Sequence, residues 1–395
     1  MTKTMRSSGT RLWVLSIGLA SVIVLLSVLA AAPAAQGQTY SVLYNFTGGS
    51  DGANPLHGSL IEDKAGNLYG TTQYGGSSGY GTVFKLTKSG TESVLYSFTG
   101  GADGAEPYGG VLLSGNTLYG TALSHGSFGW GVVFELNIKT GKYTVLYTFT
   151  GGADGGQPWA VLVRDKKGNL YGTTAFGGSG SGTVFEVVPK TKTETVLHSF
   201  AGTQETGAFS GLTLSATGRV LFGTTTWGGS SGYGVVFSLT IKTGTYTVLY
   251  NFTGSSDGRW PFGTLTLDPK GNLYGTTNLG GTEGYGTVFE VVPKSGKETV
   301  LYSFTGGADG GIPYGGVVRD KKGKLYGNTS QYGESNYYGT VYELAKGKES
   351  VLHSFDYSDG EYPYGGLLMD SKGNLYGTTY KGGSYGYGVV WEITP

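Results

Sequence analysis

Aspartate followed by glycine recurs along the chain, each time four residues before a proline. The aspartates are Asp51, Asp103, Asp154, Asp257, Asp309 and Asp359, and the prolines are Pro55, Pro107, Pro158, Pro261, Pro313 and Pro363. Carboxylates can act as acid–base catalysts or bind a hard cation. An active site needs one or two carboxylates in unequal environments, and a cation site needs several oxygens converging on one point. Six equivalent copies therefore favour a role in shaping a loop over metal binding, which stays the alternative.

Histidine and serine form no recognisable catalytic motif. His57 and His125 are isolated, and His198 and His353 each replace the tyrosine of a repeated "VLYSF" segment, so we expect the last two to be packed strand residues. The Gly-x-Ser-x-Gly pattern occurs, but in glycine-rich loops between expected strands, whereas a nucleophile elbow needs a strand-to-helix turn. We expect no cofactor and no metal.

The candidate binding residues lie where the repeated pattern is least faithful. "AGTQETGAF" brings in Glu205, "TTTWGG" brings in Trp227, and "DGRWPF" brings in Arg259 and Trp260. Aromatic side chains beside a few polar groups suit sugar stacking or a protein hot spot. Further aromatic residues expected on the same face are Tyr74, Trp159, Phe176 and Tyr332. The alternative is that these side chains pad the contacts between repeats.

Two classes of function remain open. We prefer a non-catalytic binding or scaffold protein that recognises a polysaccharide or a cell-surface protein through loops on one face. The alternative is an extracellular carbohydrate-active enzyme, a lyase or hydrolase. Its acid–base groups would come from Glu205, Asp257, Glu283 or His125.

A repeat of about fifty residues positions all these side chains. One segment of the repeat reads "VLYNF" or a close variant, and the copies of this segment begin at Val42, Val94, Val145, Val196, Val248, Val300 and Val351. Each unit holds four short runs rich in Val, Leu, Tyr, Phe and Thr, as strands should be; in the second unit they are "GGVLL", "TLYGTA", "GVVFEL" and "TVLYTF". Turns such as "DKKGN" separate the first two runs, and helical periodicity is absent after the N-terminal segment.

Seven units of four strands predict an all-β fold, a seven-bladed β-propeller of antiparallel blades around a channel. A β-solenoid is less suitable, because no capping units are visible at the ends. We expect the blade order "GGVLL", "TLYGTA", "GVVFEL", "TVLYTF" from the inside outwards. The strand at residues 39–46 then pairs with "GYGVVWEI" at 386–393 and closes the ring.

The unit "VLYSFTGG.DG..PYGGL..D..GNLYGTT..GG..GYGTVFEL" resembles the Gloeobacter–Verrucomicrobia (GloVer) repeat of secreted bacterial proteins. The resemblance covers residues 38–395 almost completely and implies an extracellular propeller. It brings no catalytic residue with it.

Residues 1–37 resemble an export signal, with Lys3, Arg6 and Arg11 before an apolar run from Leu12 to Ala30 and a small-residue segment "AAAPAAQGQ". An uncleaved anchor is the alternative, because the apolar run approaches the length of a membrane span. We expect residues 38–395 to form one domain, extracellular or periplasmic, monomeric and outside the membrane after cleavage. That part carries 24 basic and 27 acidic residues, which argues against a nucleic-acid partner.

Overall fold

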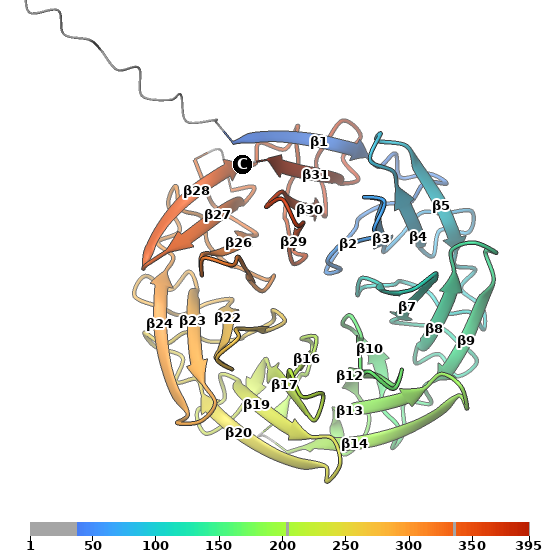
Figure 1. Cartoon of the computed structure of the whole chain (residues 1–395), viewed down its shortest axis with the longest axis horizontal. Coiled ribbons are helices and arrows are strands. Elements are labelled where there is room, and N and C mark those ends of the chain that lie inside the picture. Colours follow the sequence, from blue (N-terminus) through green and yellow to red (C-terminus); the bar gives the residue numbers. More distant parts are fainter. Residues whose placement is uncertain (1–37, 203–204, 335–336, 395) are drawn as a thin grey trace, which may run out of the picture. The chain divides into compact units, whose positions relative to one another are not determined.

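The propeller predicted from the repeats is the fold of the chain. In the computed structural model, which describes residues 38–202, 205–334 and 337–394, seven antiparallel sheets surround a central axis (Figure 1). Each blade has an inner, a second, a third and an outer strand. In blades 1 to 6 the chain runs outward through them in this order, whereas blade 7 takes its outer strand from the first strand of the described chain. The predicted signal segment, residues 1–37, lies outside the described residues.

The strands of each blade, from inner to outer, have the following bounds. Blade 1 consists of β2 (Ile61–Glu62), β3 (Leu68–Thr72), β4 (Thr82–Leu86) and β5 (Glu92–Ser97). Blade 2 consists of β6 (Leu112–Ser114), β7 (Thr117–Ala122), β8 (Val132–Asn137) and β9 (Tyr143–Thr148). Blade 3 consists of β11 (Val163–Arg164), β12 (Leu170–Phe176), β13 (Gly180–Val188) and β14 (Thr193–Ala201), and β10 (Gly156–Pro158) also pairs with β12. Blades 4 and 5 are β16 (Thr213–Leu214), β17 (Val220–Thr225), β19 (Val235–Thr240), β20 (Thr245–Asn251); and β21 (Thr266–Leu267), β22 (Leu273–Thr277), β23 (Thr287–Val292), β24 (Lys297–Ser303). Blades 6 and 7 are β25 (Val318–Arg319), β26 (Leu325–Thr329), β27 (Thr340–Ala345), β28 (Lys348–Ser354); and β29 (Leu368–Met369), β30 (Leu375–Thr379), β31 (Val389–Thr394), β1 (Thr39–Asn45). A separate pair, β15 (Glu205–Thr206) with β18 (Trp227–Gly228), accompanies blade 4.

The core lies between neighbouring blades. One cluster packs Val83 and Phe98 of blade 1 against Leu118 and Phe134 of blade 2, and all four side chains are buried. The second and third strands have partners on both faces, which explains why their sequences are apolar without clean alternation. Stacking of blades therefore supplies most of the buried apolar surface.

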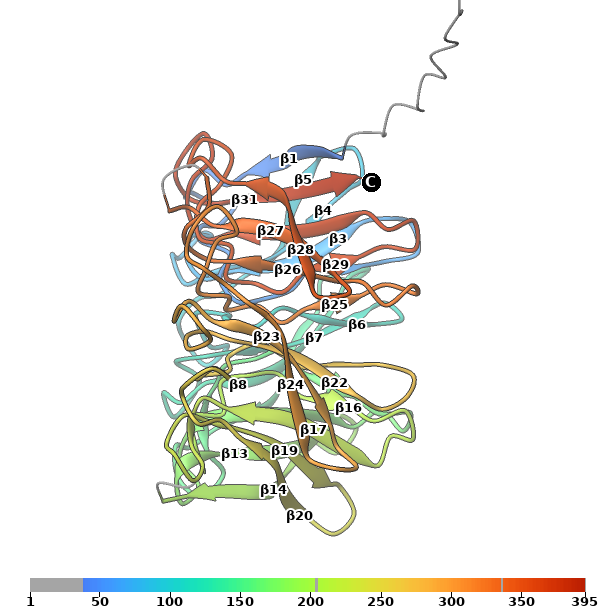
Figure 2. The ribbon, with the colours of Figure 1, turned by 90° about the vertical axis from the view of Figure 1, so that its left-hand side faces the viewer.

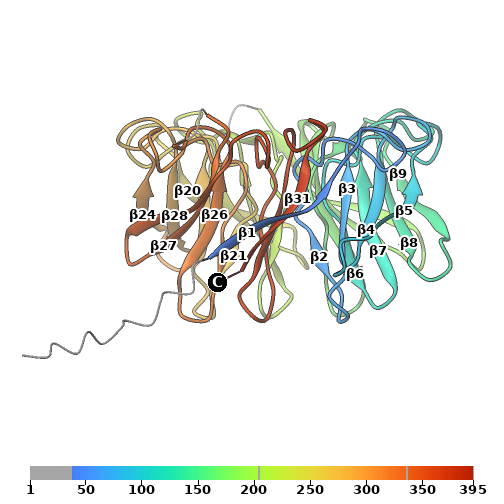
Figure 3. The same ribbon diagram turned by 90° about the horizontal axis from the view of Figure 1, so that it is seen from above.

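The ring closes as the sequence predicts. β1 runs antiparallel to β31, with Thr39 opposite Thr394 and Asn45 opposite Val389, and it forms the outer strand of blade 7 (Figures 1 and 3). Asn45 adds a side-chain link, because its Oδ1 accepts a hydrogen bond of 2.8 Å from the Ser384 N–H. The two ends of the described chain complete one blade.

The inner strands are shorter than expected. The run "GGVLL" was predicted to be strand from Gly109, but β6 begins at Leu112. A Cβ at Gly109 would lie 2.6 Å from the backbone carbon of Ala160 in the next blade. The glycine segment therefore packs against backbone of the adjacent blade and does not join its own ladder.

Two kinds of connection divide the propeller into two faces, visible edge-on in Figures 2 and 3. The term loop face is used here for the face that carries the connections from the second to the third strand and from each outer strand to the next inner strand. The hairpin face carries the turns from inner to second strand and from third to outer strand. In the turn at Asp165, Oδ1 accepts hydrogen bonds from the N–H groups of Lys167, Gly168 and Asn169, as expected for the "DKKGN" turn. Over residues 38–394, apart from the undescribed gaps, no helix has the length and apolar character to span a membrane.

Candidate functional site: the loop face and its aromatic collar

One aromatic side chain from each blade points into the channel just below the loop face. We call this set the aromatic collar: His57, Tyr108, Trp159, Phe209, Phe262, Tyr314 and Tyr364. Neighbouring ring centroids lie 4.7 Å apart for Tyr108 and Trp159 and 5.0 Å apart for Phe262 and Tyr314. Edge-to-face and offset contacts of this kind are favourable. Six rings therefore form a continuous arc from blade 2 to blade 7.

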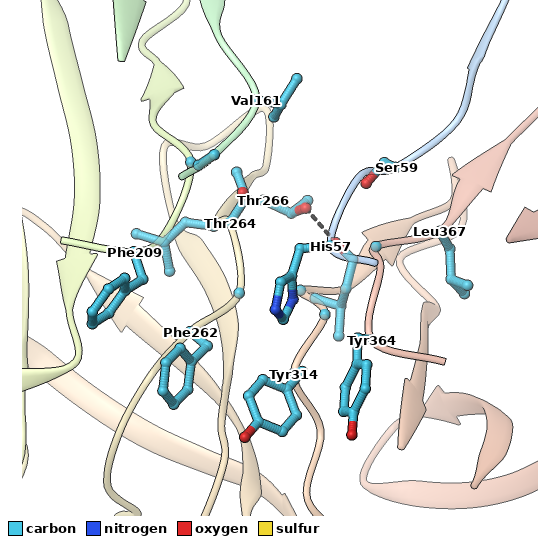
Figure 4. Close-up of a pocket in the computed structure, with 18 of the residues that line it drawn as sticks. His57, Ser59, Val161, Phe209, Phe262, Thr264, Thr266, Tyr314, Tyr364 and Leu367 are labelled. Carbon is cyan, nitrogen blue, oxygen red and sulfur yellow. Dashed lines mark hydrogen bonds between the residues drawn. The ribbon is translucent and has the colours of Figure 1, made fainter. Parts of the chain in front are cut away.

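His57 fills the centre of this arc. Its ring centroid lies 5.8 Å from that of Trp159 and 5.9 Å from that of Tyr314, on blades far apart in the sequence. Figure 4 shows the imidazole between Phe262, Tyr314 and Tyr364. Burial of the imidazole lowers its pKa to about 4, since the charged form loses its hydration there. The histidine is therefore neutral at physiological pH.

Below the collar the channel holds a cavity of about 190 Å³. Its wall consists mainly of inner-segment backbone and of Thr264, Thr266, Val161 and Leu367 (Figure 4). The Thr266 hydroxyl is occupied, because it donates to the carbonyl oxygen of Val317 in the next blade. This space is large enough for several water molecules but is too small for a sugar chain.

Trp227, one of the four residues singled out by the sequence, connects the exposed loop face to the collar. Its side chain is 42% exposed, and its ring meets that of Phe209 edge-on at 5.3 Å. Phe209 in turn lies 4.9 Å from Trp159. Gly207 makes room for the indole, because a Cβ there would lie 2.6 Å from a ring carbon of Trp227. An aromatic path thus leads from solvent to the axis.

Arg259 and Trp260 lie in the loop between blades 4 and 5. The Arg259 guanidinium carbon is 5.1 Å from the centre of the Trp260 ring, a cation–π arrangement. The Arg259 Nε is buried and has no hydrogen-bond partner among the described residues. Trp260 has a φ of 60°, and its N–H donates to the Tyr233 carbonyl oxygen of blade 4 at 3.0 Å.

The structure places these residues on neighbouring segments of one face. Glu205 pairs with Gly228 and Thr206 with Trp227, so Glu205 lies one position from Trp227 in the two-stranded β15–β18 pair. Thr226, the residue before Trp227, donates its hydroxyl to the carbonyl oxygen of Pro261, the residue after Trp260. The sequence missed the collar as a unit, and it missed His57 altogether as a channel residue.

A second set of loop-face aromatic side chains packs in the contacts between blades. The Tyr80 ring covers Gly100, where a Cβ would lie 2.6 Å from a ring carbon, and Trp130 covers Gly151 in the same way. Tyr285 covers Gly306, and its ring also meets that of Tyr332 at 4.8 Å. Trp227 differs from this set, because it contacts the collar.

Exposed aromatic side chains gather on the loop face. Over the described residues, the large aromatic side chains that are exposed are Tyr74, Tyr80, Phe128, Trp130, Phe176, Trp227, Tyr337, Tyr357, Tyr385 and Tyr387. All of them belong to connections of the loop face, where apolar exposure of this extent marks interaction surfaces. Tyr74, Phe176 and Trp227 occupy the same position of the repeat in blades 1, 3 and 4.

The repeated aspartates shape the loops, as the sequence predicts. Asp309 Oδ2 accepts hydrogen bonds from the Tyr302 hydroxyl at 2.9 Å and from the Thr305 N–H at 2.8 Å, and Oδ1 accepts one from the Thr305 hydroxyl. Asp359 has His353 in place of the tyrosine, with His353 Nε2 2.8 Å from its Oδ2. Among the described residues no group of three or more His, Cys, Asp or Glu side chains is placed to hold a metal ion.

Replacing one of these aspartates should lower stability without removing a binding site. We expect Asp309→Ala to lower the free energy of unfolding by about 1–3 kcal/mol, because four donors, the Gly307 N–H among them, lose their acceptor. The check is denaturant unfolding of the variant beside its parent. Unchanged stability together with loss of ligand binding would instead assign this loop a direct role in the site.

Three acid–base candidates of the enzyme alternative have described side chains, Asp257, Glu283 and His125, and these three lie in three different loops. Both carboxylate oxygens of Asp257 accept hydrogen bonds from Tyr250 and Thr253 within its loop. Glu283 is exposed in the connection between β22 and β23. His125 Nδ1 lies 2.9 Å from the Ser124 hydroxyl on blade 2. These side chains therefore serve separate local structures.

Comparison with known families agrees with the repeat and the fold. The model of the Gloeobacter/Verrucomicrobia repeat matches residues 32–220 and again residues 214–391. The chain belongs to the Gloeobacter/Verrucomicrobia repeat family. For this repeat protein, no curated protein gives a match.

Solved structures include proteins that are similar to this Gloeobacter/Verrucomicrobia repeat protein. The extracellular domain of a protein from B. thetaiotaomicron, described as the one component system BT4673, has a TM-score of 0.55 and 10% identity, and the match covers 90% of this chain and 40% of that chain. A protein from Bacteroides uniformis described as a 6-phosphogluconolactonase has a TM-score of 0.49 and 19% identity, with 75% and 83% covered. At these identities the likeness extends to the fold alone.

Proposed function

We propose that this repeat protein is a secreted, non-catalytic binding propeller that takes a polysaccharide on its loop face. The observation that carries the proposal is the aromatic path from exposed Trp227 through Phe209 to Trp159 in the collar. Sugar rings stack on such aromatic faces through their C–H groups, while nearby polar groups orient the hydroxyls. Arg259, part-buried beside the Trp260 ring, supplies one such group through its guanidinium.

The charge of the loop face favours a neutral or weakly acidic sugar. Within the described residues, Arg259 and Lys381 are the only Lys or Arg side chains in loop-face connections. Six of the carboxylates on this face are the repeated aspartates. A strongly anionic ligand would meet repulsion there.

Location outside the cytoplasm is part of the proposal. Its support is the export-type sequence of residues 1–37, the family, and the extracellular domain among the similar structures. A binding role in that location needs exposed, preformed recognition surface, and the loop face supplies it.

A glycan array probed with residues 38–395 tests the function. We expect a neutral or weakly acidic oligosaccharide to bind, and we expect Trp227→Ala and Trp260→Ala to weaken it by about thirtyfold, which corresponds to about 2 kcal/mol for an aromatic hot spot. Tyr385→Ala is the matched control, because Tyr385 is exposed on the same face but in blade 7. It should leave affinity unchanged.

Two results would count against the proposal. The first is a bound glycan whose affinity is the same in the parent and in both tryptophan variants. The second is release of shortened or unsaturated sugars from a bound polysaccharide, which would show a hydrolase or a lyase instead.

A further inference from the structure

The nearly balanced net charge conceals a separation of charge between the two faces. All but three of the Lys and Arg side chains in the described residues lie in or beside the turns of the hairpin face. The exceptions are Lys85, in β4, and Arg259 and Lys381, on the loop face. The hairpin face therefore differs from the loop face in charge as well as in aromatic content.

A groove of about 780 Å³ opens on the hairpin face between blades 6 and 7. The cations that line it are Arg319, Lys321, Lys322, Lys324 and Lys372. Leu367, Leu368 and Met369 supply an apolar wall. Thr266, Val318 and Leu367 line both this groove and the channel cavity, so the groove adjoins the lower end of the channel.

The carboxylates of the groove are already engaged. Asp320 Oδ1 accepts hydrogen bonds from the N–H groups of Lys322 and Lys324, and Asp370 holds the equivalent turn of blade 7. Glu343 forms an ion pair of 2.8 Å with the Lys324 ammonium group. These contacts neutralise one lysine and leave the other basic groups to a ligand.

The basic groups without such a partner are well placed for an anion. Lys321, Lys322 and Lys372 are exposed at the edge of the groove. Arg319 is part-buried, with its guanidinium carbon 5.9 Å from the centre of the Tyr274 ring and its Nη1 3.4 Å from the Asp320 carbonyl oxygen. Ammonium and guanidinium groups bind carboxylate and phosphate oxygens through charge-assisted hydrogen bonds.

We propose that this groove is a second binding site, for a saccharide that carries acid groups, carboxylate or phosphate. The apolar wall accommodates the C–H face of a sugar ring, and the three exposed lysines and Arg319 take the acid groups. The volume is typical of a small-molecule site. The site is separate from the loop-face site, since the two lie on opposite faces and differ in charge.

The chain contains a matched control hairpin. Blade 3 reads "VRDKKGN" from Val163 and blade 6 reads "VRDKKGK" from Val318, so Lys166 and Lys167 correspond to Lys321 and Lys322. The blade 3 pair does not line the groove. Variants of the two hairpins remove the same charge and differ only in location.

Calorimetric titration of residues 38–395 at low salt tests the site. The acidic probes are trigalacturonate and glucose 6-phosphate, which distinguish carboxylate from phosphate recognition, and maltotriose is the neutral probe. We expect at least one acidic probe to bind, maltotriose not to bind in the groove, and Lys321→Ala/Lys322→Ala to weaken the acidic probe about tenfold. The Lys166→Ala/Lys167→Ala variant should stay within twofold of the parent. Affinity should also fall as salt is raised.

Several results would overturn the proposal. One is no binding of either acidic probe. Another is equal weakening by both lysine pairs, which would indicate a general effect of positive charge. Binding of inorganic phosphate or of a short single-stranded DNA as tightly as the acidic sugar would remove the assignment to a saccharide. Thermal unfolding of both variants shows that they are folded.

Discussion

A protein that begins at Thr47, and so lacks β1, is expected to unfold roughly 5 °C or more below one that begins at Gln38. Blade 7 would lose its outer strand and the whole ladder to β31. Phe46, fully buried, would also be lost, together with the Tyr40 ring, which stacks on His353 at 3.7 Å. Full burial of an apolar side chain contributes about 1.5–3 kcal/mol. The part-buried Val42, Leu43 and Tyr44 also pack against the core and would be lost. For the five side chains together we expect a loss of at least about 5 kcal/mol.

A protein that begins at Thr39 is the control, because it removes only Gln38 and keeps the strand intact. Calorimetric melting of the three proteins is the measurement. Equal melting temperatures for starts at Thr39 and Thr47 would contradict closure by β1.

The second large effect is the loss, as pH rises from about 4.5 through 7, of a stabilising contribution from protonated glutamates. Four glutamates near the start of outer strands make this contribution: Glu92, Glu194, Glu298 and Glu349. Burial and a nearby loop aspartate raise the pKa of each to about 7, and in each one carboxyl oxygen is buried without a hydrogen-bond partner. In this range the folded protein holds protons that the unfolded chain has released, so a rise in pH favours unfolding.

These side chains are part-buried, so the effect is smaller than for fully buried groups. We expect about 1 kcal/mol from each glutamate, measured by denaturant unfolding at a series of pH values. Glu298→Gln should flatten the dependence in proportion, because the neutral amide carries no titration. His57 acts in the opposite sense at acid pH, since its pKa of about 4 means that stability falls as pH drops below the ordinary histidine range. Because the His57 contribution overlaps this pH range with the opposite sign, the decisive comparison is between parent and variant. An identical pH dependence of stability in the parent and in Glu298→Gln would contradict this account.

The blade order, the closing strand and the loop role of the aspartates could all be predicted from the sequence. Each of these three predictions depends on features that recur in nearly every repeat, such as the hydrogen-bonded Asp309 and the regular spacing of the "VLYSF" segments. A repeated residue type in a repeated loop has one structural explanation that serves all copies. This is why its position could be interpreted without coordinates.

The collar could not be predicted in the same way. In the first repeat, Leu56 is an extra residue between Pro55 and His57, so alignment on the proline places leucine where the structure has histidine. Only the ring geometry shows that His57 meets Trp159 and Tyr314 from distant blades. An alignment on the following glycine, Gly58, would have supplied the signal.

The sequence contains the separation of charge between the two faces, but the net charge of the chain does not show it. Lysines occur repeatedly in "DKKGN"-type turns, which the propeller gathers on one face. The groove between blades 6 and 7 required the structure, since the blade 3 hairpin carries the equivalent Arg164, Lys166 and Lys167 but does not line this groove.

The most direct test of the loop-face site is an NMR titration of the tryptophan indole N–H signals with the glycan selected on the array. We expect the signals of Trp227 and Trp260 to shift with one common affinity. The signal of Trp391 should stay in place, because that side chain is fully buried between blades. Binding of the glycan with no shift at Trp227 or Trp260 would contradict the central claim that this aromatic surface is the recognition site.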